Sequence, residues 1–161
     1  MSGLQFSTST SSSLGELYRQ PHGSYTSPQW SGVVSVGDLS QWQVEAIRKL
    51  LQLFTLPLDW DSYGSPPPSE VAIMAAVRLI LRIDLESFLS PLVVPVAGGG
   101  VQLEWRHGSR EIEIEIDDDG SAGYLKSQHG KPIEEEQIYL ADPARIRALL
   151  TWLIASEQAS D

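Results

Sequence analysis

The spacing of apolar residues along the chain predicts three helices. Over 39–54 apolar side chains recur every three or four positions, as on one helical face, and Asp38 or Ser40 can cap the first turn. Over 69–88 apolar residues cover almost the whole circumference, which is typical of a helix at the centre of a core. An Asp-Pro pair, a common helix start, opens a third amphipathic segment over 143–157.

After the second helix the pattern changes to strict alternation, which predicts strands. Apolar and polar residues alternate over 101–106 and again over 111–116. Gly108–Ser109 suits a two-residue type II′ turn, with glycine in the first position. That turn sets Trp105 opposite Ile112 and places the apolar side chains of both strands on one face.

A second hairpin is predicted at Asp119–Gly120, a pair that favours a type I′ turn. This turn would set Leu125 opposite Ile114 on the apolar face. Tyr124 and Lys126 would then lie on the other face, among the glutamates of the preceding strand.

The flanking segments are expected to add little to this sheet. Residues 91–96 form an edge strand at best, because Pro95 cannot donate to a ladder. The polar stretch 127–137 is expected to be a loop, and 138–140 a short fourth strand. The sequence therefore predicts an α+β fold, a three- to four-stranded antiparallel meander with three helices packed on one face.

The folded domain is expected to span 38–158. Residues 1–37 are rich in Ser, Thr, Gly and Pro, a composition that buries too little apolar surface to offset chain entropy. They are therefore expected to form a disordered leader. Apolar islands around Leu17 and Val34 leave open a docking segment or an added edge strand.

Charge and composition narrow the range of functions. The 161 residues include 21 acidic and 11 basic side chains, a net charge of −10. An acidic surface repels phosphate, so binding to nucleic acid or to an anionic membrane is not expected. The absence of cysteine excludes disulfides, thiol nucleophiles and cysteine-based zinc sites. No apolar run is long enough to span a membrane and no secretory signal is recognisable, so a cytoplasmic protein is expected.

The segment between the first two helices is the most distinctive one. Asp59, Trp60, Asp61 and Tyr63 could line a ligand site, where aromatic rings stack and carboxylates accept hydrogen bonds or bind a cation. Alternatively, Trp60 and Tyr63 plug the core between the helices, Asp61 caps backbone amides and Gly64 supplies a positive φ.

The same segment carries a resemblance. Trp60–Pro66 reads Trp-Asp-x-Tyr-Gly-x-Pro, and after the next helix Gly99–Trp105 reads Gly-Gly-Val-Gln-Leu-Glu-Trp before the Glu/Ile strand. In this order and spacing, over residues 56–126, the chain resembles a group of small bacterial proteins without an assigned activity. The resemblance implies a bacterial, intracellular, single-domain protein and assigns no catalytic residue.

Metal binding is not expected. The acidic turn Asp117–Gly120 lacks the spaced ligands of a calcium loop and suits a hairpin turn instead. His22, His107 and His129 each lie beside glycine, and none belongs to a helical pair that could hold zinc.

The leading hypothesis is a non-enzymatic domain that binds another protein with a basic surface. The chain contains no nucleophile elbow and no phosphate-binding glycine loop, so neither catalytic residues nor a cofactor are expected. Glu104, Glu113 and Glu115 are expected to form the binding face, with Tyr124 and Trp152 as aromatic anchors. An antitoxin-like or immunity-like role fits such a protein by analogy.

Two alternatives stay open. One is a small-molecule-binding domain or carboxylate-dependent hydrolase centred on Asp59–Tyr63. The position of Trp60 tests this alternative: a ligand site requires Trp60 in a cleft with Asp61 and Tyr63, whereas a plug requires it in the core. The other is a decoy that imitates nucleic-acid phosphate, which requires acidic side chains spaced along one elongated face.

Overall fold

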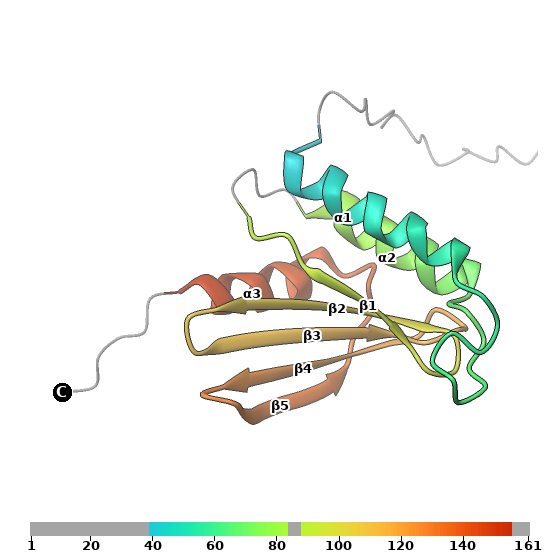
Figure 1. The fold of residues 1–161 in the computed structure, drawn as a ribbon. Helices are drawn as coiled ribbons and strands as arrows, with labels where there is room; N and C mark the ends of the chain where they lie inside the picture. Colours follow the sequence, from blue (N-terminus) through green and yellow to red (C-terminus); the bar gives the residue numbers. More distant parts are fainter. Residues whose placement is uncertain (1–38, 84–87, 156–161) are drawn as a thin grey trace, which may run out of the picture. The chain divides into compact units, whose positions relative to one another are not determined.

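The computed structural model describes residues 39–83 and 88–155, all of which belong to the unit Val34–Asp161. Figure 1 shows the elements in chain order: α1 (Gln41–Gln52), a 3-10 turn (Leu53–Thr55), α2 (Glu70–Arg82), β1 (Leu92–Val96), β2 (Gly100–His107), β3 (Arg110–Ile116), β4 (Ala122–Gln128), β5 (Lys131–Gln137) and α3 (Pro143–Ile154). The predicted leader 1–37, with His22, lies outside the described residues. None of the helices in the described ranges is long and apolar enough to cross a membrane.

Each helix begins where the sequence offers a side-chain cap. Ser40 and Gln43 form a capping box at the start of α1, and the Ser69 side chain accepts from the first turn of α2. Asp142 caps α3, with Pro143 in the first turn. The three predicted helix starts are therefore confirmed to within two residues.

Helix α2 ends at Arg82, earlier than the predicted residue 88, because a side chain of α1 caps it. Ile83 has an extended backbone, and 84–87 lie outside the described residues. The buried Gln43 Nε2 donates to the carbonyls of Ile80 (3.0 Å) and Ile83 (3.1 Å). Carbonyls at a helix end need such partners, and here a residue of another helix supplies one.

The sheet has five antiparallel strands in the order β1-β2-β3-β4-β5, so the α+β class is confirmed while the strand number exceeds the predicted three to four. The β2–β3 hairpin has the predicted register, with Trp105 opposite Ile112. Gly108 has a φ of 58°, as the first position of a type II′ turn requires. Strand β1, with Pro95, is an edge strand as expected.

The register predicted for the β3–β4 hairpin is wrong by one residue. The loop is longer than Asp119–Gly120, because Asp117 N–H donates to the Ser121 carbonyl (2.8 Å) and Gly120 has a φ of 87°. This is a three-residue loop with a left-handed glycine, another common hairpin connection. Side chains in a strand alternate, so the shift exchanges the two faces of β4.

The consequences for β4 are specific. Tyr124, and not Leu125, lies opposite Ile114 on the apolar face. Lys126 lies opposite Ile112 on that face as well, while Leu125 pairs with Glu113 on the other face.

The predicted loop over 127–137 is also wrong, because β4 continues to Gln128 and most of the stretch forms β5. His129 and Gly130 connect the strands with φ values of 53° and 70°, the pair of left-handed residues of a type I′ turn. Residues 138–140, predicted as a strand, are irregular. The run of glutamates in β5 suggested a solvated loop, yet it forms the edge of the sheet.

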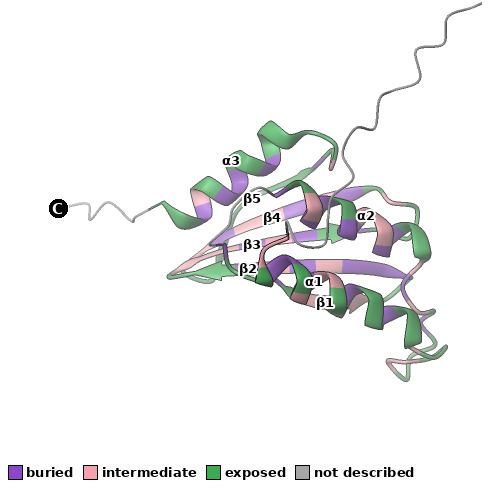
Figure 2. Cartoon of the chain, turned by 90° about the horizontal axis from the view of Figure 1, so that it is seen from above, coloured by how far each residue is buried: buried purple, intermediate pink, exposed green. Residues whose placement is uncertain are grey.

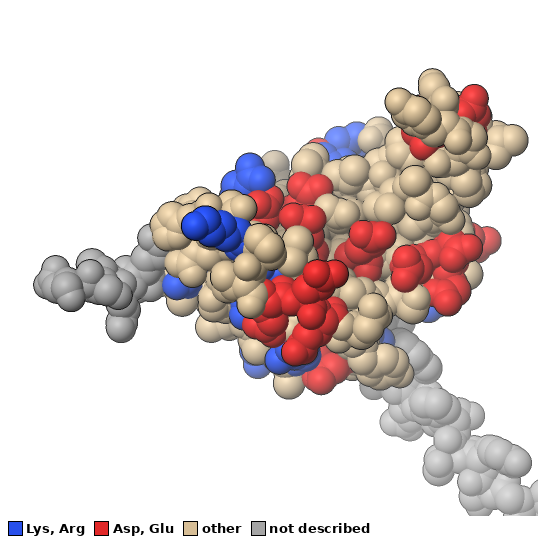
Figure 3. Space-filling model, turned by 90° about the horizontal axis from the view of Figure 1, so that it is seen from below, with Lys and Arg blue, Asp and Glu red and all other residues tan. Residues whose placement is uncertain are grey.

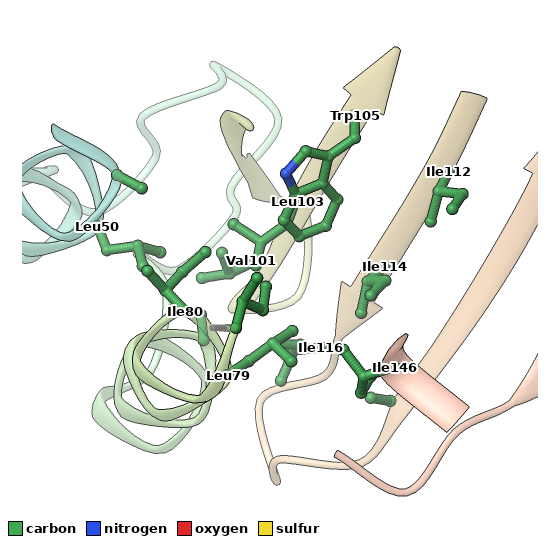
Figure 4. Packing of buried hydrophobic residues seen from close by; sticks show 14 of the residues in the cluster. Leu50, Leu79, Ile80, Val101, Leu103, Trp105, Ile112, Ile114, Ile116 and Ile146 are labelled. Atoms are coloured by element: carbon green, nitrogen blue, oxygen red, sulfur yellow. The ribbon is translucent and has the colours of Figure 1, made fainter. Parts of the chain in front are cut away.

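The core lies on the face of the sheet that β2 and β3 line with apolar side chains. Figure 1 shows α1, α2 and α3 on one side of the sheet, and in Figure 2 the purple positions of the helices face the strands. In Figure 4 Val101 and Ile116 point toward α2, beside Leu79 and Ile80. All four side chains are almost completely buried. On the opposite face the outward side chains of β2 and β3 are polar, whereas β1 and β4 add apolar ones such as Leu92 and Leu125.

Candidate functional site

The face of the sheet turned away from the core is acidic. Strict alternation places Glu104 of β2 and Glu113 and Glu115 of β3 on this outer face, opposite to the buried Leu103 and Ile114. Their predicted orientation is confirmed. Figure 3 shows the underside of the molecule, where acidic side chains gather in several groups.

A hollow of about 580 Å³ opens on this outer face. Its lining includes five acidic residues, together with two glutamines, Tyr124 and the apolar Leu125; the acidic ones are Glu113, Glu115, Asp117, Glu135 and Glu136. Gly123 of β4 also lines the hollow, opposite Glu115, and a glycine has no side chain to fill it. The hollow is therefore open, polar and rich in carboxylates.

Like charges meet directly on the outer face. Glu104 pairs with Glu113 across β2 and β3, and such a pair is destabilising. Gln102 Nε2 bridges the two carboxylates, donating to each at 3.0 Å. Arg106 is the one cation among the outward side chains of β2, β3 and β4, and it forms an ion pair with Glu111.

The shortage of cations affects the ionisation of Glu113. Partial burial, reinforced by the charges of Glu111 and Glu104, raises the pKa of the Glu113 carboxyl above its ordinary value. Arg106 and the hydrogen bond from Gln102 act in the opposite direction and do not cancel the shift. A cation brought to the hollow would stabilise the ionised form of Glu113.

Asp117 and Glu135 are members of this site that the sequence interpretation missed. Asp117 was assigned only to a turn, and Glu135 to a solvated loop. The signal for Glu135 was the His129–Gly130 pair, which suits a type I′ hairpin and would have added β5 beside β4.

The loop between α1 and α2 does not plug the core. Trp60 is only half-buried, and its indole N–H donates to the Pro66 carbonyl at 3.0 Å. The Tyr63 side chain is 93% exposed. The prediction that Trp60 and Tyr63 fill the space between the helices is therefore wrong.

The aspartates of this loop bind its own backbone. Asp61 accepts hydrogen bonds from Tyr63 N–H (2.9 Å) and from the Ser65 hydroxyl (2.6 Å), which lower the pKa of its carboxyl. Asp59 accepts from Gly64 N–H at 2.6 Å, and Gly64 has a φ of 88°. The predicted roles of Asp61 and Gly64 are confirmed. Since Tyr63 points to solvent, it forms no cleft with Asp61, and this geometry does not favour a hydrolase there.

Tyr124 also borders the hollow, but its side chain lies on the inner face of the sheet, opposite Ile114. Its side chain is 2% exposed, and its hydroxyl contacts Glu134, Glu136 and Arg145. Burial, followed by the hydrogen bond to Glu134, raises the pKa of Tyr124 to about 12. Tyr124 therefore joins β4, β5 and α3 and is not a surface anchor.

Trp152 is also used within the fold. It is half-buried between two cations, with Lys126 Nζ 4.6 Å and Arg110 Cζ 5.1 Å from its ring centroid. Arg110 Nη1 further donates to the carbonyls of Trp152 and Ala155, where α3 ends instead of at the predicted residue 157. The expectation that Trp152 is an exposed anchor is therefore wrong.

Among residues 39–83 and 88–155, no group of three or more His, Asp or Glu side chains is placed to hold a metal ion. Comparison with protein-family models, curated proteins and solved structures finds no match for this chain. The chemistry of the site therefore follows from its own side chains, which accept hydrogen bonds and attract cations.

Proposed function

We propose that the chain is a non-enzymatic protein-binding domain whose outer sheet face takes a basic surface of a partner protein. The observation that carries this proposal is the row of strand carboxylates facing outward with Arg106 as the one cation among them on β2, β3 and β4. Antitoxins and immunity proteins are proteins of this class, and we place the chain among such neutralising or positioning partners.

The hollow gives the face a point of specific contact. A lysine or arginine side chain entering beside Gly123 would meet Glu113, Glu115 and Glu135 together. It would relieve the repulsion between Glu104 and Glu113, which Gln102 offsets only in part. Charges around the contact would chiefly raise the association rate, as complementary fields do.

The test compares two double variants with the same net charge. Glu113→Gln/Glu115→Gln removes two carboxylates from the outer face, and Glu45→Gln/Glu70→Gln removes two from the helices. The partner is first isolated by affinity purification and identified by mass spectrometry, and association rates are then measured from low to physiological salt. We expect the outer-face variant to associate about tenfold more slowly at low salt, with a flatter salt dependence.

The control variant should keep the wild-type rate within about twofold, because its charges lie away from the docking face. Equal rates for both double variants at low salt would exclude the acidic face as the docking surface.

The hollow itself is tested by Gly123→Val. A Cβ at Gly123 would meet its nearest atoms at 3.6 Å, an ordinary contact, so the backbone leaves room for the first atom of a side chain. The side chain would occupy the floor of the hollow and should weaken binding at least tenfold, whereas thermal melting should change little. Unchanged affinity would show that the partner does not enter the hollow.

A more specific candidate is a decoy for a partner that itself binds nucleic acid. Glu111, Glu113 and Glu115 occupy alternate positions of one strand, which spaces their carboxylates by about 6–7 Å in a straight row. This row supports a decoy, which requires acidic groups along one elongated face. If the partner surface binds phosphate, duplex DNA should compete with this chain for the partner. If DNA does not compete, the decoy is excluded and the partner has a basic surface that does not bind nucleic acid.

A further inference from the structure

The loop between α1 and α2 has two non-glycine residues in the left-handed region of the backbone. Asp59 and Ser62 have φ values of 62° and 64°, in the left-handed region that non-glycine residues rarely adopt. Residues kept in such regions are held there by the surrounding structure, and they are frequent at functional sites.

Hydrogen bonds hold this shape from both ends of the loop. Asp59 N–H donates to the Ser65 carbonyl at 2.9 Å, and Ser62 N–H donates to the Asp59 carbonyl at 3.0 Å. The carboxylates of Asp59 and Asp61 accept from backbone amides inside the loop, and the Trp60 indole ties the loop to Pro66. The polar side chains of Asp59, Trp60 and Asp61 therefore stabilise the backbone of the loop.

The loop exposes two large apolar or aromatic side chains beside the polar Asp59 and Ser62. Tyr63 at its tip is 93% exposed, and Leu58 is 73% exposed. Between residues 56 and 69 there is no lysine or arginine, and Asp59 and Asp61 make the loop acidic. An acidic loop with internal hydrogen bonds therefore displays an aromatic ring and an aliphatic side chain to solvent.

The loop adjoins the end of the sheet where the outer acidic face also ends. Ser69 N–H donates to the Gly99 carbonyl (2.8 Å), and the Ser69 hydroxyl donates to the Asp118 carbonyl (2.7 Å). Asp118 follows Asp117, which lines the hollow. Figure 1 shows the α1–α2 loop at this end of the sheet. The loop and the acidic face therefore adjoin through the β3–β4 turn.

We propose that this loop is a preformed anchor for the same partner, with Tyr63 inserting into an apolar pocket whose rim is basic. The inference rests on the proposed function, since the acidic face and the loop would be covered by one partner. It deepens that function by stating the partner's chemistry: an apolar pocket for a phenol ring, beside cations that face the carboxylates.

Physical reasons favour Tyr63 as such an anchor. A tyrosine contributes a large contact area with only two side-chain torsions to fix, and buried aromatic anchors dominate binding energy at many interfaces. Hydrogen bonds within the loop favour this conformation before binding, which lowers the entropic cost of association.

The experiment introduces the photo-cross-linking amino acid p-benzoylphenylalanine into the full chain, at position 63, 115 or 139 in separate samples. Position 115 reports on the acidic face, and Tyr139, which is 76% exposed, is the matched control for an exposed tyrosine. After irradiation in the native host cells, adducts are identified by mass spectrometry. The partner found is then purified, and its affinity for Tyr63→Ala, Tyr139→Ala and wild-type chains is measured.

We expect positions 63 and 115 to cross-link to the same protein and position 139 to give no adduct. Tyr63→Ala should weaken binding at least 30-fold without altering its salt dependence, and Tyr139→Ala should bind within about twofold of wild type. Capture of a protein at position 63 does not by itself support the proposal. The affinity of the same partner, once purified, must also fall when Tyr63 is replaced by alanine.

The possible failures are distinguishable. An adduct at 115 without one at 63, or a Tyr63→Ala chain that binds within twofold of wild type, overturns the anchor and leaves the acidic face as the docking surface. Adducts at 63 without any at 115, together with salt-independent binding, overturn the acidic face. The absence of adducts at both positions counts against both proposals.

Discussion

At the scale of single residues, Trp105 and Trp60 contribute differently to the stability of the fold. Trp105 is 1% exposed and donates to the Leu89 carbonyl at 3.1 Å, whereas Trp60 is half-buried in its loop. We expect Trp105→Ala to lower the free energy of unfolding by about 3–5 kcal/mol, as large aromatic truncations in cores do. Trp60→Ala should cost about 1–2 kcal/mol, mainly a hydrogen bond and partial burial. Urea unfolding of both variants measures the difference, and equal losses would contradict it.

Tyr124 gives the molecule an alkaline sensitivity. Its pKa is raised from 10.0 to about 12, so the neutral phenol is favoured in the folded state. A raised pKa contributes stability that is present below about pH 10 and is lost as the pH rises toward 12. Tyr124→Phe should cost about 1–2 kcal/mol at pH 8, because Glu134 and Arg145 lose a partner.

The difference between wild type and Tyr124→Phe should therefore shrink between pH 10 and pH 12. Guanidinium unfolding at several alkaline pH values measures that difference. The titration of all other groups affects both chains equally and therefore cancels. A constant difference across this range would show that Tyr124 does not titrate with a raised pKa.

Glu113 is expected to oppose folding at neutral pH. Its pKa is raised by burial and by Glu111 and Glu104, so its ionisation as the pH rises above the ordinary value destabilises the fold. Glu113→Gln should stabilise the protein by a few tenths of a kcal/mol at pH 7, the scale of one like-charge cross-strand pair. The gain should be smaller at pH 4, where Glu113 is protonated, and smaller in high salt. A loss of stability at pH 7 would mean that the carboxylate is needed for the fold.

At the scale of elements, one glycine fixes how closely β2 and β3 approach. A Cβ at Gly100 would lie 2.8 Å from the Ile116 carbonyl oxygen, whereas a Cβ at Gly123 meets nothing closer than 3.6 Å. Gly100→Ala should therefore cost about 1–3 kcal/mol, because backbone has to move. Gly123→Ala should stay within about 0.5 kcal/mol of wild type. Thermal or urea unfolding compares the two, and a tolerated Gly100→Ala would show that the strands separate easily.

The hairpins show what the sequence could and could not predict. Gly108–Ser109 fixed the β2–β3 register, because only one loop length matched the alternation on both strands. At Asp119–Gly120 two loop lengths were compatible with the glycine, and the choice depended on the Asp117–Ser121 pairing, which is not visible in a pattern. The one-residue difference moved Tyr124 from the outer face to the inner one.

The same reasoning separates the predicted from the missed parts of the site. Glu104, Glu113 and Glu115 lie on strands with clean alternation, so their face could be predicted. The position of Asp117 in the site depends on the length of the β3–β4 loop, and that of Glu135 on an edge strand rich in glutamate. The spacing of apolar residues predicts neither of these features. Helix ends were missed where a distant side chain supplies the cap, as Gln43 does for α2.

At the scale of the whole molecule, apolar and acidic surfaces are separated by the sheet. The buried apolar residues, the first of them Trp42 in α1 and the last Leu153 in α3, lie on the side of the sheet that the helices cover. The outward side chains of β3 on the other side are glutamates, whose like charges repel one another. Cations brought to this surface would relieve the repulsion, which is the physical basis of the proposed binding function.

The remaining prediction concerns the first 30 residues, whose Ser, Thr, Gly and Pro content offers little apolar surface to a core. Deleting 1–30 should change the melting temperature by less than about 4 °C, whereas Leu153→Ala, at a side chain with 0% exposure, should lower it more. Differential scanning calorimetry of the full chain, the truncated chain and the Leu153→Ala chain makes the comparison under one set of conditions. A drop of more than about 8 °C on truncation, the scale of one to two kcal/mol, would show that the leader is part of the fold. If stability is retained while binding to the isolated partner is lost, the apolar islands of the leader contribute to docking.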